Sequence, residues 1–194
     1  MIRFPRLAAA LGAVILAAPA AIAETSPADS WWERLEVLCG QAFEGRLMRA
    51  PDGDDSLSDQ RLVMHVRSCE PDRIRIPFIA GEDLSRTWVL TRHENGTIEL
   101  RHDHRHPDGT EEDATQYGGA TVSPGSDFGQ IFPGDHVTTA RLPTSWQNVW
   151  LMEVHPGERF VYHVRRVGTE RAFHVEFNLT ATVEPPPAPW GWTD

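Results

Sequence analysis

The chain has 194 residues, of which 24% are charged and 40% are hydrophobic. This composition is typical of one globular domain and excludes a disordered, collagen-like or multi-domain protein. The formal net charge is -10, and all 18 basic residues are arginine. Because an acidic chain without a polybasic run is repelled by phosphate groups, the charge argues against nucleic acid and anionic lipid as partners.

The first segment, residues 1–23, has the three parts of a secretory signal peptide. Arg3 and Arg6 precede an apolar stretch from Leu7 to Ala18, and the small residues of Ala21-Ile22-Ala23 follow it. The stretch is too short for a membrane span, and no later segment has about 20 consecutive apolar residues. We therefore expect an exported protein, periplasmic or secreted, whose mature chain begins near Glu24.

One helix is predicted at the start of the mature chain, over residues 30–39. Ser30 and Glu33 have the spacing of a capping box, and Gly40 can end the helix. Cys39 and Cys69 are the two cysteines of the chain. An even pair in an exported domain favours a disulfide, and the alternative of a catalytic or metal-bound thiol lacks a C-x-x-C spacing.

Strand patterns follow the helix. Alternating or short apolar runs predict about nine strands, at residues 42–49, 61–69, 73–80, 86–93, 97–106, 110–117, 148–155, 159–167 and 171–179. Such a series after one helix is typical of an all-β, antiparallel up-and-down barrel of the calycin or lipocalin type, with a two-sheet jelly roll as the alternative.

Loops and the tail complete the expected domain. Residues 121–143 have few strand signals and are expected to form a long connection or lid. The barrel domain is predicted over residues 24–183, followed by a proline-rich tail over 184–194. We expect this tail to be extended and to be held to the barrel by Trp190 or Trp192.

Histidines dominate residues 97–110, which read TIELRHDHRHPDGT. A strand alternates its side chains between two faces, so one face carries Ile98, Leu100, His102, His104 and His106. Pairing across the Pro107-Asp108-Gly109 turn places His104 opposite Glu112 and His102 opposite Ala114. A two-residue turn at Asn95-Gly96 places His93 opposite Ile98, at the other end of the same face.

Two or three neutral imidazoles with one carboxylate can hold a divalent transition metal such as Zn, Fe or Mn. The candidate residues for a ligand or metal are His102, His104, His106 and Glu112. Secondary candidates are His93, Glu111 and His136. The alternative is that these histidines are structural or hydrogen-bonding groups, because surface strands near hairpin tips often carry histidine.

A metal-dependent enzyme is one alternative function. The spacing of Gly96, His102-x-His104, Glu111 and Gly118 resembles the first cupin motif, although the gap before the glutamate is longer. Pro133-Gly134-Asp135-His136 is only loosely similar to the second cupin motif. The resemblance implies cupin-like metal chemistry at these histidines.

The aromatic residues favour a binding protein as the first prediction. Large aromatic side chains on the predicted strands are expected in the core or the barrel lining, namely Trp88, Trp150, Phe160, Tyr162, Phe173 and Phe177. A barrel lined in this way can hold one small-molecule ligand. A third possibility is a structural or interaction protein of the cell envelope, whose tail or 121–143 loop contacts a partner.

Several segments, among them RLVMHVRSC, LRHDHRHPDGTEED and PPPAPWG, resemble those of an uncharacterised family of small exported bacterial proteins. The resemblance covers nearly all of the mature chain. It implies an exported bacterial protein and carries no catalytic residues with it.

Overall fold

The computed structural model describes residues 25–54 and 56–193. The predicted signal peptide and the predicted mature start at Glu24 lie outside the described residues. The helices and strands, in chain order, are α1 (Pro27–Glu36), β1 (Ala42–Arg49), β2 (Leu62–His65), β3 (Ser68–Glu70), β4 (Arg73–Ala80), β5 (Asp83–Arg92), β6 (Ile98–His104), β7 (Tyr117–Ala120), β8 (Gly129–Pro133), α2 (His136–Arg141), the 3-10 helix η1 (Pro143–Ser145), β9 (Asn148–His155), β10 (Arg159–Arg166) and β11 (Ala172–Asn178).

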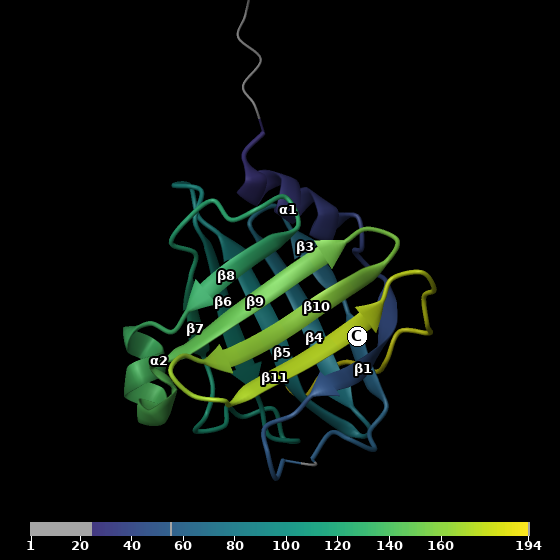
Figure 1. The fold of residues 1–194 in the computed structure, drawn as a ribbon. Helices are drawn as coiled ribbons and strands as arrows, with labels where there is room; N and C mark the ends of the chain where they lie inside the picture. The colour runs from purple at the N-terminus through teal and green to yellow at the C-terminus, as the bar shows by residue number, and fades with distance from the viewer. Residues whose placement is uncertain (1–24, 55, 194) are drawn as a thin grey trace, which may run out of the picture.

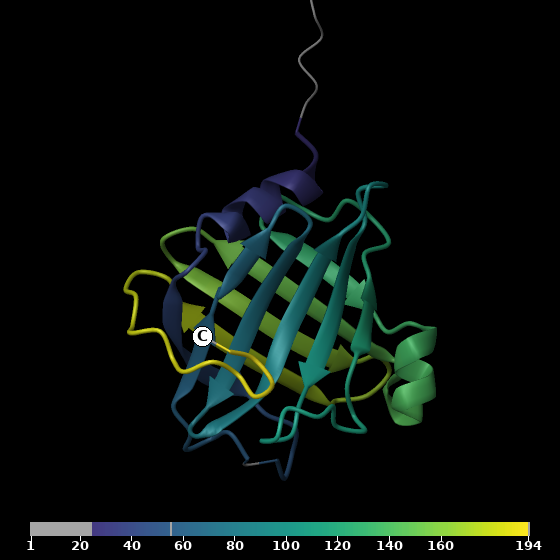
Figure 2. The same cartoon turned by 180° about the vertical axis from the view of Figure 1, so that it is seen from behind.

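The strands form one antiparallel sheet that curls into a nearly closed barrel (Figures 1 and 2). Their order is β7-β6-β5-β4-β2-β1-β11-β10-β9-β8, and β3 also pairs with β4. Each strand pairs with at least one strand next to it in chain order, which confirms the predicted antiparallel barrel. A jelly roll would instead separate them by Greek-key crossings.

The barrel closes at the seam between β7 and β8. Here the backbone N–H of Asp135 donates to the carbonyl of Gly118 at 3.2 Å. A Cβ atom on Gly119 would lie 1.9 Å from the carbonyl oxygen of Pro133. The two edge strands therefore approach closely because Gly119 of β7 carries no side chain.

α1 lies across one end of the barrel (Figure 1). Its apolar face places Trp31, Trp32 and Leu35 in the core with no exposed surface, and the ring of Trp31 packs 6.3 Å from that of Phe132. This end of the barrel is thus filled by helix side chains. None of the helices within residues 25–54 and 56–193 is long and apolar enough to cross a membrane.

The helix begins earlier than the capping box predicted. Ser26 is the N-cap, and its hydroxyl accepts a hydrogen bond from the backbone N–H of Asp29 at 3.1 Å. Pro27 occupies the first helical turn, where its missing N–H costs nothing. The predicted start at Ser30 was therefore wrong, because the Ser26-Pro27 signal one turn upstream initiates the helix.

A disulfide joins Cys39 and Cys69, with the two Cα atoms 6.2 Å apart. This confirms the predicted bridge. It ties the segment that follows α1 to β3 and so fastens the helix over its end of the barrel.

Three predicted segments differ from the observed strands. The strand predicted over 61–69 is divided into β2 and β3, because the chain leaves the sheet at residues 66–67. Residues 110–116 form a loop with one isolated bridge, between Arg105 and Glu111, and β7 begins only at Tyr117. Gln116 has a positive φ of 58°, and the Thr115 hydroxyl accepts a hydrogen bond from the backbone N–H of His104, so both residues interrupt an extended pairing. The predicted 121–143 connection contains β8 and α2, and α2 is capped by the side chain of Asp135.

The C-terminal tail returns along the outside of the barrel, as Figure 2 shows in yellow. Val183 bridges to Ala42, and the backbone N–H of Trp190 donates to the carbonyl of Leu84 at 3.1 Å. The Arg75 guanidinium lies 5.2 Å from the ring centre of Trp192. Both tryptophans named from the sequence therefore contact the barrel.

Candidate ligand-binding site

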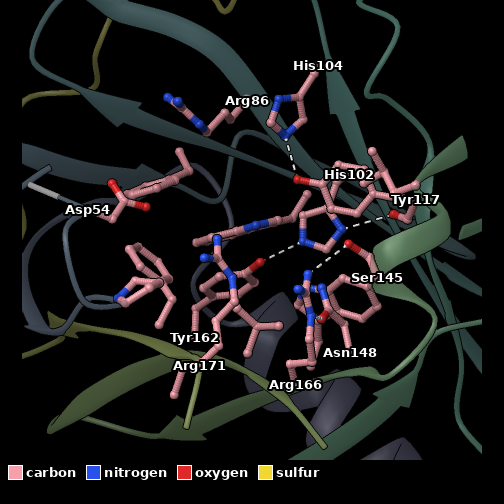
Figure 3. Close-up of a pocket in the computed structure, with 18 of the residues that line it drawn as sticks. Asp54, Arg86, His102, His104, Tyr117, Ser145, Asn148, Tyr162, Arg166 and Arg171 are labelled. Atoms are coloured by element: carbon pink, nitrogen blue, oxygen red, sulfur yellow. Dashed lines mark hydrogen bonds between the residues drawn. The ribbon is translucent and has the colours of Figure 1, made fainter. Parts of the chain in front are cut away.

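A cavity of about 310 Å³ lies at the barrel end opposite α1. The two ends of β5 show that the cavity and α1 lie at opposite ends of the barrel. Arg92, at one end of the strand, lies 3.5 Å from Asp29 of α1, whereas Arg86, near the other end, lines the cavity (Figure 3). The volume is at the lower end of the range for small-molecule sites.

Strand register arranges the inward side chains in layers that run down from the mouth of the cavity. On one wall each layer is a cross-strand pair of β5 and β6, and on the other wall each layer is a pair of β9 and β10. From the mouth inward these pairs are Arg86 with His104 and Asn148 with Arg166, then Trp88 with His102 and Trp150 with Val164, then Leu90 with Leu100 and Met152 with Tyr162. The wall therefore changes from charged and polar at the mouth to aromatic and aliphatic below.

His102 is buried in the second layer, where it is 2% exposed. Its Nδ1 lies 3.0 Å from the backbone carbonyl of Tyr117, and its Nε2 lies 2.8 Å from the hydroxyl of Tyr162. Because a carbonyl only accepts, Nδ1 carries the proton and Nε2 accepts from the Tyr162 hydroxyl. The ring of Tyr117 stacks on the imidazole at 4.5 Å, so every polar atom of His102 is satisfied within the protein.

His104 lies next to this group, in the mouth layer. Its Nε2 forms a hydrogen bond of 3.0 Å with the Tyr117 hydroxyl, and its Nδ1 lies 3.8 Å from a carboxylate oxygen of Glu112. Glu112, His104 and Tyr117 therefore form a connected row that ends at the cavity wall.

Burial keeps these groups uncharged. Desolvation lowers the pKa of His102 to about 3, and desolvation together with the charge of Arg86 lowers the pKa of His104 to about 4. Burial raises the pKa of Tyr117 to about 12 and that of Tyr162 well above its ordinary value. At neutral pH, the histidines and tyrosines of the site therefore act as neutral hydrogen-bonding groups.

Arginines supply the positive charge of the cavity. The half-buried Arg166 donates from Nε to Oδ1 of Asn148 at 3.2 Å and from Nη2 to Oγ of Ser145 at 3.3 Å. Arg86 forms an ion pair with Asp83. In Figure 3, Arg166 and Arg171 enter the cavity from one side, and Arg86 lies on the other.

The structure brings together part of the predicted site. His102 and His104 line the cavity, and Glu112 lies beside His104 as the register predicted. The remaining candidates are exposed and lie outside the cavity lining, namely His93, His106, Glu111 and His136. The side chain of Glu111 instead accepts a hydrogen bond from Gln116 at 3.0 Å.

Two predicted pairings are shifted. The backbone N–H of His93 donates to the carbonyl of Thr97, so His93 is not opposite Ile98. His93 is opposite Thr97, and the loop between these two residues has three residues and not two. Gly96, with φ 82°, closes this loop because its backbone N–H donates to the carbonyl of His93. His102 pairs with Tyr117 and not with Ala114.

The donor geometry favours hydrogen-bonding histidines over a metal site. Both nitrogens of His102 are engaged by protein atoms. In the part of the chain that the structure describes, no three residues of the His, Cys, Asp and Glu types gather closely enough to hold a metal ion. The cupin-like spacing also fails here, since Glu111 lies on the outside of the barrel.

Several important residues of the site had not been predicted. Tyr117 lies in the glycine-rich stretch Tyr117-Gly118-Gly119, which has no alternation to indicate a strand. Arg166 does carry a signal, because it continues the alternation of Tyr162 and Val164 and so places a cation on the inner face. Tyr162 was predicted in the core or the barrel lining, whereas Arg166 was expected on the exterior.

Comparison of this chain with protein-family models, with curated proteins and with solved structures found no match in any of the three. Its function is therefore inferred from its own site.

Proposed function

We propose that this protein binds a small organic molecule inside its barrel. The observation that carries the proposal is the asymmetry of the interior. One end is filled by Trp31 and Trp32 of α1, whereas the other holds a cavity of about 310 Å³. Since protein interiors are normally packed to the density of organic crystals, an open, aromatic-lined end supports a binding role.

The lining supports this role further. Trp88, Trp150 and Phe173 offer apolar surface, and His104, Tyr117 and Asn148 offer polar atoms near them. A mostly apolar wall with a few convergent polar groups is the usual composition of a ligand pocket. Binding outside the cytoplasm is part of the proposal, supported by the secretory pattern of residues 1–23 and by the Cys39–Cys69 disulfide.

The test uses N-phenyl-1-naphthylamine, an uncharged fluorescent probe, with the mature, disulfide-bonded protein. We expect its emission to rise and saturate at one probe per chain. Val164→Trp, which adds a large side chain to the inner wall, should weaken binding by at least about tenfold because it occupies the cavity.

Val37→Trp is the matched control. Val37 is 75% exposed at the end of α1, far from the cavity, and its replacement should leave probe binding unchanged. Circular dichroism would establish that both variants are folded. Absence of probe binding to the wild-type protein, or unchanged binding by folded Val164→Trp, would refute the proposal.

A further inference from the structure

The charges around the cavity are mostly positive, whereas the net charge of the whole molecule is negative. The chain carries a net charge of -10, yet the cavity lining includes Arg86, Arg166 and Arg171. Asp54 is the one carboxylate among the lining residues that the structure describes. The mouth is therefore a locally positive region of an acidic protein, and such a region attracts anions.

The three arginines differ in how far their charge is neutralised. Arg86 is paired with Asp83. Arg171 is exposed and lies within electrostatic range of Asp54. Within residues 25–54 and 56–193, the guanidinium of Arg166 bonds only to the neutral side chains of Asn148 and Ser145.

Those two contacts orient the Arg166 guanidinium without cancelling its charge. A guanidinium has five N–H donors in a planar fork that matches carboxylate and phosphate oxygens. Asn148 and Ser145 use two of its groups from one side, Nε and Nη2. A half-buried cation held in this way is stabilised when an anion occupies the remaining donors.

The order of the inward side chains determines where the rest of a ligand would lie when its anionic group is bound at Arg166. Arg166 stands in the mouth layer, directly above Val164 on the same face of β10. Trp150 pairs with Val164, and Trp88 of the opposite wall stacks on Tyr162, the next residue inward on this face of β10. A ligand bound through Arg166 therefore meets the aromatic surface of both tryptophans on its inward side.

We infer that the ligand of this cavity is a small anionic amphiphile, with a carboxylate, phosphate or sulfonate group at Arg166 and an apolar, ring-sized body against Trp88 and Trp150. Arg171 adds a second positive charge beside the acid group. The inference rests on the proposed binding function and names the chemical class of the ligand.

Two probes separate this inference from the function on which it rests. 8-Anilinonaphthalene-1-sulfonate is N-phenyl-1-naphthylamine with one added sulfonate. Because a hydrogen bond to a charged group is stronger than one between neutral groups, we expect the anionic probe to bind the wild-type protein about tenfold more tightly or better. Val164→Trp should weaken the binding of both probes.

Arg166→Gln should reduce the preference for the anionic probe, measured as the ratio of the two probe affinities, at least about tenfold. Arg165→Gln is the matched control, because Arg165 is exposed on the outer face of the same strand and its loss changes the net charge equally. This control should keep the preference of the wild-type protein.

The outcomes are distinguishable. Binding of the neutral probe without a preference for the anionic one, or a preference that survives Arg166→Gln, would overturn the inference and leave the binding function standing. Equal losses in Arg166→Gln and Arg165→Gln would also overturn it, because the effect would then follow from net charge. Failure of both probes to bind the wild-type protein would overturn the binding function and the inference together.

Discussion

Acidification should destabilise this protein well above the pH at which its carboxylates become protonated. His102 and His104 are buried as neutral imidazoles, and burial lowers their pKa values to about 3 and about 4. In the unfolded chain a histidine has a pKa near 6.5. As the pH falls below about 6.5, the unfolded state therefore takes up protons that the folded state does not, and stability falls.

The size of the effect follows from the linkage relation. Between pH 7 and pH 5, a histidine that titrates near 6.5 only when unfolded lowers the free energy of unfolding by about 2 kcal/mol. The two histidines together give about 4 kcal/mol, a large part of the stability of an ordinary domain. The loss continues below pH 5 until the folded-state values near 4 and 3 are passed.

The assay is urea unfolding, followed by tryptophan fluorescence, at several pH values from 7 to 5. Each single variant, His104→Gln or His102→Gln, should remove about 2 kcal/mol of the pH dependence. The double variant should remove about 4 kcal/mol. These differences hold even if the variants are less stable than the wild-type protein at pH 7. A double variant with the pH dependence of the wild-type protein would refute the assignment of the effect to these buried imidazoles.

Three further substitutions test the fold and the site. Replacing Cys39 and Cys69 with alanine should lower the free energy of unfolding by about 3 to 4 kcal/mol, since the bridge spans a sequence separation of 30; chemical denaturation measures this loss, and a loss near zero would contradict it. Tyr162→Phe leaves the buried Nε2 of His102 without its donor and should cost about 1 to 3 kcal/mol in the same assay. Gly119→Ala forces a Cβ against the backbone of β8 and should destabilise the barrel by about 1 to 3 kcal/mol, seen as a lower thermal midpoint; an unchanged midpoint would mean that the seam can open without cost.

The barrel could be predicted from the sequence because most of its strands have alternating or short apolar runs. Strands β1, β4 and β9 begin and end where their apolar alternation does. Tertiary contacts decide the segments where prediction failed. In β8 the two buried residues are Gln130 and Phe132, and Gln130 is polar, so the strand has no apolar alternation. β7 contains the pair Gly118-Gly119, which has no side chains to alternate. Neither strand can therefore be recognised from the local sequence.

The candidate site was predicted in part for the same reason. Alternation along β6 correctly placed His102 and His104 on the inner face. Alternation does not show where the strand ends, so His106 was also predicted on this face. It lies beyond the end of β6 and is exposed. Tyr117 reaches His104 from β7, the strand that pairs with β6. Arg166 reaches the cavity from β10 on the opposite wall, so its place in the site follows from the curling of the sheet into a barrel.

The hydrogen bonds of the inner layers also restrict how a ligand can be oriented. The imidazole of His102 and the hydroxyl of Tyr162 satisfy each other, and the backbone of Tyr117 satisfies the remaining nitrogen. A polar group pushed to this depth would displace one of these bonds or stay unpaired, and either result is unfavourable in a buried site. Donors not already engaged inside the protein are found at the mouth, on Arg166. The same residues that make the floor of the cavity neutral therefore favour one orientation, in which the acid group of the ligand faces the solvent end and its apolar body faces the core.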